Sequence, residues 1–174
     1  MQSFFEYMIM LGFYCFVLYP KWKKDNCFLK TLFYLYLCMV ISVTLLPLPS
    51  ITSFHWPSRN ILNYGNFTLF IDLIKNRPLA VKEIVLNILM LIPFGVLYPF
   101  AFKKKALISI TLGIGLSVVI ETLQLLFSAF LRSNRTFDVT DILTNAIGCV
   151  IGVLIYKVLS ILIGFWFKNT NDQV

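Results

Sequence analysis

The chain has 174 residues, of which 59% are hydrophobic and 13% are charged, and its formal net charge is +7. Soluble domains usually contain about 45–50% apolar and about 25% charged residues, so this composition excludes an ordinary soluble domain and indicates a membrane protein. One membrane span needs about 20 mostly apolar residues, so four or five spans use up the length and leave no room for a soluble catalytic domain. We therefore expect a single integral membrane domain over residues 1–174, an all-α bundle of about five transmembrane helices.

Five apolar stretches are the predicted spans. They cover residues 3–19, 30–48, 84–102, 106–130 and 141–165. The first stretch lacks a preceding basic segment, contains Glu6 and ends without a small-residue cleavage site. These features favour a retained span over a signal peptide.

Lysines predict the orientation of the spans. Residues 21–30 contain four lysines, and residues 103–105 are three consecutive lysines. The positive-inside rule places both connections in the cytoplasm. The N-terminus and the segments 49–83 and 131–140 then lie outside, and the C-terminus lies inside the bacterial cytoplasmic membrane. Because lysines that flank spans also explain the positive net charge, we expect no nucleic-acid partner.

The outer segment 49–83 is the longest predicted connection. Within it, residues 67–75 are short and amphipathic, which fits a helix in the membrane interface or one that dips back into the membrane. We prefer the interface. His55, the only histidine of the chain, is expected to be a solvated loop residue.

The four cysteines predict neither a metal site nor a disulfide. They have no CxxC spacing, and three of them lie inside apolar stretches. Such cysteines usually behave as small buried hydrophobes. We therefore expect no metal and no cofactor.

One face of the fourth stretch is polar. Ser117, Glu121, Gln124 and Ser128 follow one another at helical spacing and share that face. An ionisable group inside a membrane is costly and by default indicates function. A carboxylate at Glu121 needs an arginine, a hydrogen-bond network or a proton, and our candidate partners are Arg132 and Arg135.

The fifth stretch begins with a second polar face. Asp138, Asp141 and Asn145 are followed on that face by Gly148 and Gly152. Asp138 could serve only as a helix cap, but a second acid one turn later is more than a cap requires. The two glycines are expected to allow close helix packing.

The third stretch contributes another polar pair. Glu83 and Asn87 are one turn apart, and Pro93 and Gly95 follow them. We expect Pro93 to kink the helix, because a proline in a helix interior removes a hydrogen bond.

These polar groups are predicted to converge. At about 1.5 Å per residue, all of them lie in the outer half of the membrane, so the three spans could form one outward-facing polar pocket. Gln124 and Asn145 have two interpretations, which are hydrogen bonds between helices and direct contact with a ligand.

At these residues the chain resembles the VanZ-like family, small membrane proteins associated with resistance to teicoplanin and related glycopeptides. The resemblance rests on NILMLIPFG (87–95), ETLQLLF (121–127) and the segment from Arg135 to Gly152, and it covers about residues 60–157. It implies a four-helix core over about residues 28–165 with the first span as an addition. Arg135 matches the motif arginine better than Arg132, although both remain candidates.

The resemblance also implies a set of site residues. The family tends to carry an N-x-x-P-F segment before the third span, whereas this chain has NYGNF (63–67), with Asn66 in place of the proline. The candidate pocket residues are Asn63, Asn87, Glu121, Gln124, Arg132, Arg135, Asp138, Asp141 and Asn145. The expected structural residues are Pro93, Gly95, Gly148 and Gly152.

Three functions are compatible with these residues. The first is a non-enzymatic pocket that binds a membrane lipid, a lipid-linked cell-wall precursor or a lipoglycopeptide drug. The second is an intramembrane enzyme in which Glu121, Asp138 and Asp141 supply acid–base chemistry or hold a divalent cation. The third is a small lipid transporter. The chain has no HExxH or GxSxG motif, so we favour the first function.

Overall fold

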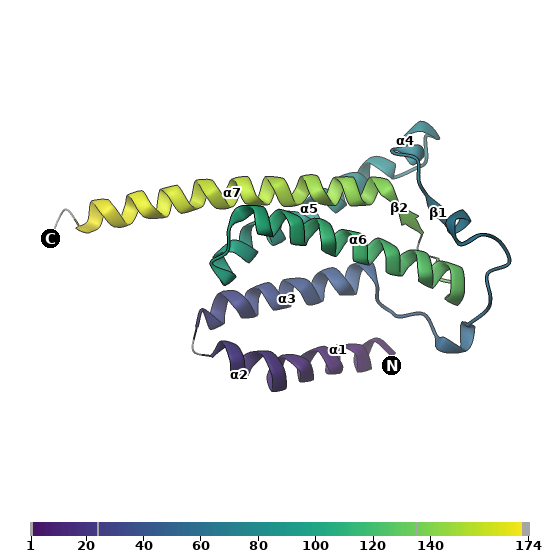
Figure 1. The fold of residues 1–174 in the computed structure, drawn as a ribbon, viewed down its shortest axis with the longest axis horizontal. Coiled ribbons are helices and arrows are strands. Elements are labelled where there is room, and N and C mark those ends of the chain that lie inside the picture. Colours follow the sequence, from purple (N-terminus) through teal and green to yellow (C-terminus); the bar gives the residue numbers. More distant parts are fainter. Residues whose placement is uncertain (1, 24, 135, 172–174) are drawn as a thin grey trace.

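The protein is a bundle of long helices with one extended connection at one end (Figure 1). The computed structural model describes residues 2–23, 25–134 and 136–171. The long helices are α3 (Cys27–Thr44), α5 (Ala80–Phe102), α6 (Ala106–Leu131) and α7 (Val139–Asn171). The shorter elements are α1 (Gln2–Phe13), η1 (Tyr14–Leu18), α2 (Tyr19–Trp22), η2 (Ile51–Ser53), η3 (Ile61–Tyr64), β1 (Gly65–Asn66), α4 (Ile71–Ile74) and β2 (Phe137–Asp138).

Four helices are long and apolar enough to cross a membrane. They are α3, α5, α6 and the part of α7 from Val139 to Trp166. Helices α1 and α2 form an additional N-terminal helical segment with the π-helical turn η1 between them. The prediction of an all-α bundle of about five helices is therefore confirmed, with the N-terminal segment as its shortest member.

The N-terminal segment packs against α3 through polar and aromatic contacts. Tyr34 donates a hydrogen bond of 2.6 Å to the carbonyl oxygen of Met10. The hydroxyls of Tyr14 and Thr31 are 2.7 Å apart, and the rings of Tyr14 and Tyr34 stack with centroids 5.3 Å apart. These contacts join the middle of the segment to α3.

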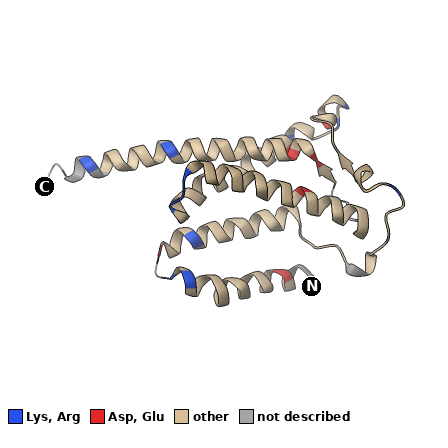
Figure 2. Cartoon of the chain, viewed as in Figure 1, with Lys and Arg blue, Asp and Glu red and all other residues tan. Residues whose placement is uncertain are grey.

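The two ends of the bundle differ in charge (Figure 2). Lysines gather around the α2–α3 and α5–α6 connections, including residues 103–105. Most of the acidic residues lie toward the opposite end, near the start of α7. The helices alternate in direction, so the ends of α3 and α6 meet the starts of α5 and α7 at this acidic end.

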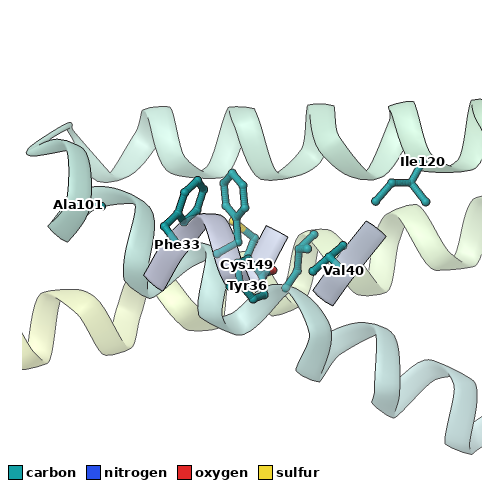
Figure 3. Close-up of a cluster of buried hydrophobic side chains, with 8 residues drawn as sticks. Phe33, Tyr36, Val40, Ala101, Ile120 and Cys149 are labelled. Atoms are coloured by element: carbon teal, nitrogen blue, oxygen red, sulfur yellow. The ribbon is translucent and has the colours of Figure 1, made fainter. Parts of the chain in front are cut away.

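The apolar core fills the middle of the bundle. Phe33, Tyr36 and Cys149 lie between the helices, and Ile120 lies farther along (Figure 3). The Phe33 ring makes an edge contact with Phe94 at 5.4 Å between centroids. Further rings extend this cluster toward the lysine-rich end, namely those of Tyr98 and Phe102.

Helices α5 and α7 approach each other closely at their glycines. A Cβ atom added to Gly148 would collide with the backbone carbonyl of Ile88 in α5, and one added to Gly152 would collide with that of Ile92. An added Cβ at Gly95 would collide with the backbone of α7 at Cys149. Only residues without side chains permit this backbone contact.

Helix α5 is continuous through Pro93, with that residue inside it.

The connection between α3 and α5 lies over the acidic end. Its strand β1 pairs in parallel with β2, so that Gly65 lies opposite Phe137 and Asn66 lies opposite Asp138. The rings of Phe67 and Phe137 stack at 4.8 Å. The helix predicted over residues 67–75 is shorter in the structure, where it is α4 alone.

Candidate functional site

A cavity of about 540 Å³ opens at the acidic end of the bundle. Side chains from α3, α5, α6 and α7 line it, together with the segments around α4 and β2. Six of the predicted pocket residues lie around it. These are Asn87, Glu121, Gln124, Asp138, Asp141 and Asn145.

Two of the other predicted pocket residues, Asn63 and Arg132, are not among the residues that line the cavity. Asn63 is exposed in η3, and Arg132 is exposed at the end of α6. Arg135 lies outside the described residues. The neighbouring Asn66 does reach the site: its side-chain nitrogen donates a hydrogen bond of 3.2 Å to a carboxylate oxygen of Asp138.

Glu121 is buried on the inner wall of the cavity, with only 2% of its surface exposed. Its Oε2 accepts a hydrogen bond of 2.9 Å from the backbone N–H of Asp138. The predicted partners of Glu121 were Arg132 and Arg135. Arg132 lies 11 positions farther along, about 16 Å along the helix axis, and Arg135 lies outside the described residues. In the described part of the chain, the hydrogen-bond partner of Glu121 is thus a backbone donor at the start of α7.

Asp138 connects three parts of the site. Its Oδ1 accepts the backbone N–H of Thr140 at 2.7 Å, as a helix N-cap does, and its Oδ2 accepts Asn66. The hydroxyl of Thr140 in turn accepts the backbone N–H of Phe70 at 2.9 Å. These bonds fix the start of α7 against both the connection and α6.

Asp141 lies in a cluster of acidic residues. It interacts electrostatically with Asp138, Glu83 and Asp72, and the Asn87 side chain is its hydrogen-bond partner. Asp141 and Asp138 also interact electrostatically with Glu121. Ionised carboxylates that interact in this way repel one another. A positively charged ligand would relieve this repulsion.

Among the described residues that line the cavity, Arg77 is the one cation. It forms ion pairs with Asp72 at 2.6 Å and with Glu83 at 3.0 Å, and its side chain is half exposed. Neither Arg77 nor Asp72 was among the residues predicted for the pocket. Their opposite charges just before α5 were the available signal, but the chain turns between them, so helical spacing did not connect them to the site.

Gln124 and Asn145 both make the interhelical hydrogen bonds that were one of their two interpretations. Gln124 donates to the Thr44 carbonyl at the end of α3, at 3.0 Å. Asn145 donates to the Ser117 hydroxyl of α6, at 2.9 Å. The side-chain oxygen of Asn145 is buried and has no hydrogen-bond partner within the described part of the chain.

The cavity also has an apolar wall. Met39 and Val43 of α3 and Leu86 and Leu89 of α5 line it and are largely exposed on the outer surface of the bundle. In a membrane these exposed apolar side chains face lipid chains. No group of three or more His, Cys, Asp or Glu side chains within residues 2–23, 25–134 and 136–171 is arranged to hold a metal ion.

The same region of the chain matches a known family. A family model described as VanZ/LLP1 matches residues 33–162. This range covers well over half of the chain and contains every residue that lines the cavity. No curated protein and no solved structure matches the chain.

Proposed function

The chain belongs to the VanZ/LLP1 family of multi-pass membrane proteins, and from this premise we propose that its cavity binds a cell-envelope lipid or a lipid-linked precursor. Through this binding the protein contributes to protection against teicoplanin-type glycopeptides. The resistance associated with VanZ-like proteins supports the second part of the proposal.

The observation that carries the proposal is the amphipathic lining of the cavity. One side presents buried polar groups, including Glu121, Asp138 and Asn145, and the other presents apolar side chains of α3 and α5. Binding sites of this kind combine an apolar surface with a few polar groups that orient the ligand. A lipid fits this lining with its headgroup at the polar side and its chains between α3 and α5.

The distribution of lysines supports an outward-facing cavity. The cavity is at the end of the bundle opposite residues 103–105 and the lysines of the α2–α3 connection. If those lysines face the cytoplasm, the cavity opens at the outer leaflet of the bacterial cytoplasmic membrane. Glycopeptides and lipid-linked precursors meet on that side.

The packed middle of the bundle favours binding over transport through the protein. Phe33, Phe94 and Phe102 fill the space between the cavity and the lysine-rich end. A transported headgroup would have to displace these rings. The packing thus supports a cavity that is open at one end.

The function can be tested by glycopeptide susceptibility in cells that depend on this protein for protection. Alanine variants of Glu121, Asp141 and Asn145 should lose protection when they are expressed at the level of the wild type. Thr122→Val is the matched control, because Thr122 is exposed on α6 and its hydroxyl bonds only to its own helix, at Val118. Full protection by all three alanine variants would refute the proposal.

A further inference from the structure

The cavity is acidic in a chain that is basic. Five carboxylates line it, from Asp72, Glu83, Glu121, Asp138 and Asp141. They are five of the seven acidic residues in the described part of the chain, whereas the chain as a whole has a net charge of +7. Arg77 is the one basic residue among the described lining residues.

A second observation points to a ligand that donates hydrogen bonds. Asn145 is 2% exposed and lines the cavity, and its Oδ1 has no partner among the described residues. Buried polar atoms in proteins are nearly always hydrogen-bonded. The amide nitrogen of Asn145 is already bonded to Ser117, so the group left without a partner is an acceptor.

No group in the described part of the chain donates a hydrogen bond to Asn145 Oδ1. The carboxylates of Glu121 and Asp141 accept hydrogen bonds when ionised and do not donate them. The amide nitrogen of Gln124 is bonded to Thr44. A positively charged group with N–H donors would satisfy both the free acceptor of Asn145 and the ionised carboxylates of the lining.

We propose that the cavity binds the protonated primary amine of an amphipathic molecule. The ammonium group lies among the carboxylates and donates to Asn145, and its apolar chain lies against α3 and α5. This inference rests on the proposed function and names the chemical class of its ligand. Hydrogen bonds between ionised partners are stronger than those between neutral groups, so the amine dominates selection among lipids.

Other headgroups fit the lining less well. A phosphate or a pyrophosphate alone would face five carboxylates, and Arg77 already shares its guanidinium with Asp72 and Glu83. A quaternary ammonium carries the charge but has no N–H to donate to Asn145. A zwitterionic lipid with a primary amine satisfies both demands, with its phosphate toward the half-exposed Arg77.

Two sources of this amine are compatible with the proposed function. One is the headgroup of an aminolipid such as phosphatidylethanolamine, and the other is an amino group of a lipoglycopeptide drug. Both carry an amine and an apolar chain. The test therefore uses separate measurements for the two sources.

The first measurement is lipid competition on the purified full-length protein, read by native mass spectrometry. The competitors are phosphatidylethanolamine, its N-acetylated form, phosphatidylcholine and phosphatidylglycerol with identical acyl chains. We expect phosphatidylethanolamine to be retained about tenfold over the N-acetylated form, as the loss of a charged hydrogen bond predicts. Glu121→Gln and Asp141→Asn should reduce this ratio, and Thr122→Val should not.

The second measurement is binding of a teicoplanin-type drug in nanodiscs of phosphatidylcholine, with its amines free or N-acetylated. Preference for the free amine in either measurement supports the inference and identifies the source.

If lipid is retained but acetylation changes neither measurement, the amine inference is overturned while lipid binding stands. If neither lipid nor drug is retained, both the inference and the proposed binding function are overturned. An amine preference that is unchanged in both carboxylate variants also overturns the inference, because the amine then lies elsewhere.

Discussion

Replacing Gly148 by alanine tests the close contact between α5 and α7. The added Cβ would lie 2.9 Å from the carbonyl carbon of Ile88 and even closer to its oxygen. Carbon atoms pack best at about 3.5–4.0 Å, so the two helices must separate locally by about 0.6 Å or more. Since both partners of this collision are backbone atoms, no side-chain rotation can relieve it.

The expected cost follows from that separation. Overpacking of a well-packed core typically costs about 1–3 kcal/mol, and we expect Gly148→Ala to lower the free energy of unfolding within this range. Unfolding is followed by circular dichroism in mixed micelles with increasing denaturing detergent. Because Asn145 lies one turn before Gly148, the variant should also weaken retention of a bound lipid.

Gly164 of the same helix supplies the control. An added Cβ there would meet no atom within 4 Å. Gly164→Ala should leave stability unchanged or raise it by up to about 1 kcal/mol, because alanine has the higher helix propensity. The reasoning fails if the two alanine variants unfold alike, or if Gly148→Ala lies within about 0.5 kcal/mol of the wild type, as ordinary surface substitutions do.

Three further substitutions test other parts of the fold. Asp138→Ala removes the cap of α7 and should cost about 0.5–2 kcal/mol of stability in the same unfolding assay; Asp138→Asn keeps an acceptor and should cost less, and equal losses would contradict the capping role. Tyr36→Phe removes a 2.8 Å hydrogen bond to the Met90 carbonyl and should cost about 0.5–1.5 kcal/mol, whereas unchanged stability would show that this bond contributes nothing. The Lys30 ammonium, at 2.8 Å, holds the pKa of the Asp25 carboxyl below its usual value, so the pair stabilises the fold at neutral pH and this stabilisation is lost as the pH falls through the lowered pKa. Asp25→Asn should therefore be less stable than the wild type at neutral pH in thermal unfolding, and the difference should vanish in acid; a difference that persists at low pH contradicts the ion-pair explanation.

The sequence predicted the architecture because helix period and span length are local properties. Glu121 and Gln124 share a face by spacing alone, as do Asp141 and Asn145, and the four residues lie around one cavity. The lysines at residues 103–105 marked the turn between α5 and α6 correctly. Features of this kind depend only on nearby residues.

What the sequence did not predict depends on how the chain turns between helices. Arg77 reaches the cavity because the segment around α4 lies over the end of the bundle, and no periodic pattern encodes that position. The partner of Glu121 is the backbone N–H of Asp138, and every residue type except proline carries such a group. Charge matching suggested Arg132 or Arg135; Arg132 lies three turns away along the chain from Glu121, and Arg135 lies outside the described residues.

The glycine contact also determines which wall of the cavity can move. Helices α5 and α7 touch through their backbones, so they behave as one rigid unit that carries Asn87, Asp141 and Asn145. Helix α3 is held at this end by the bond from Gln124 to the Thr44 carbonyl. Because no described glycine brings the backbone of α3 into such a contact, we expect a ligand with bulkier chains to shift α3 outward into the surrounding lipid, while Asn87, Asp141 and Asn145 keep their spacing. Selectivity for the headgroup and tolerance for the chains thus reside in different helices.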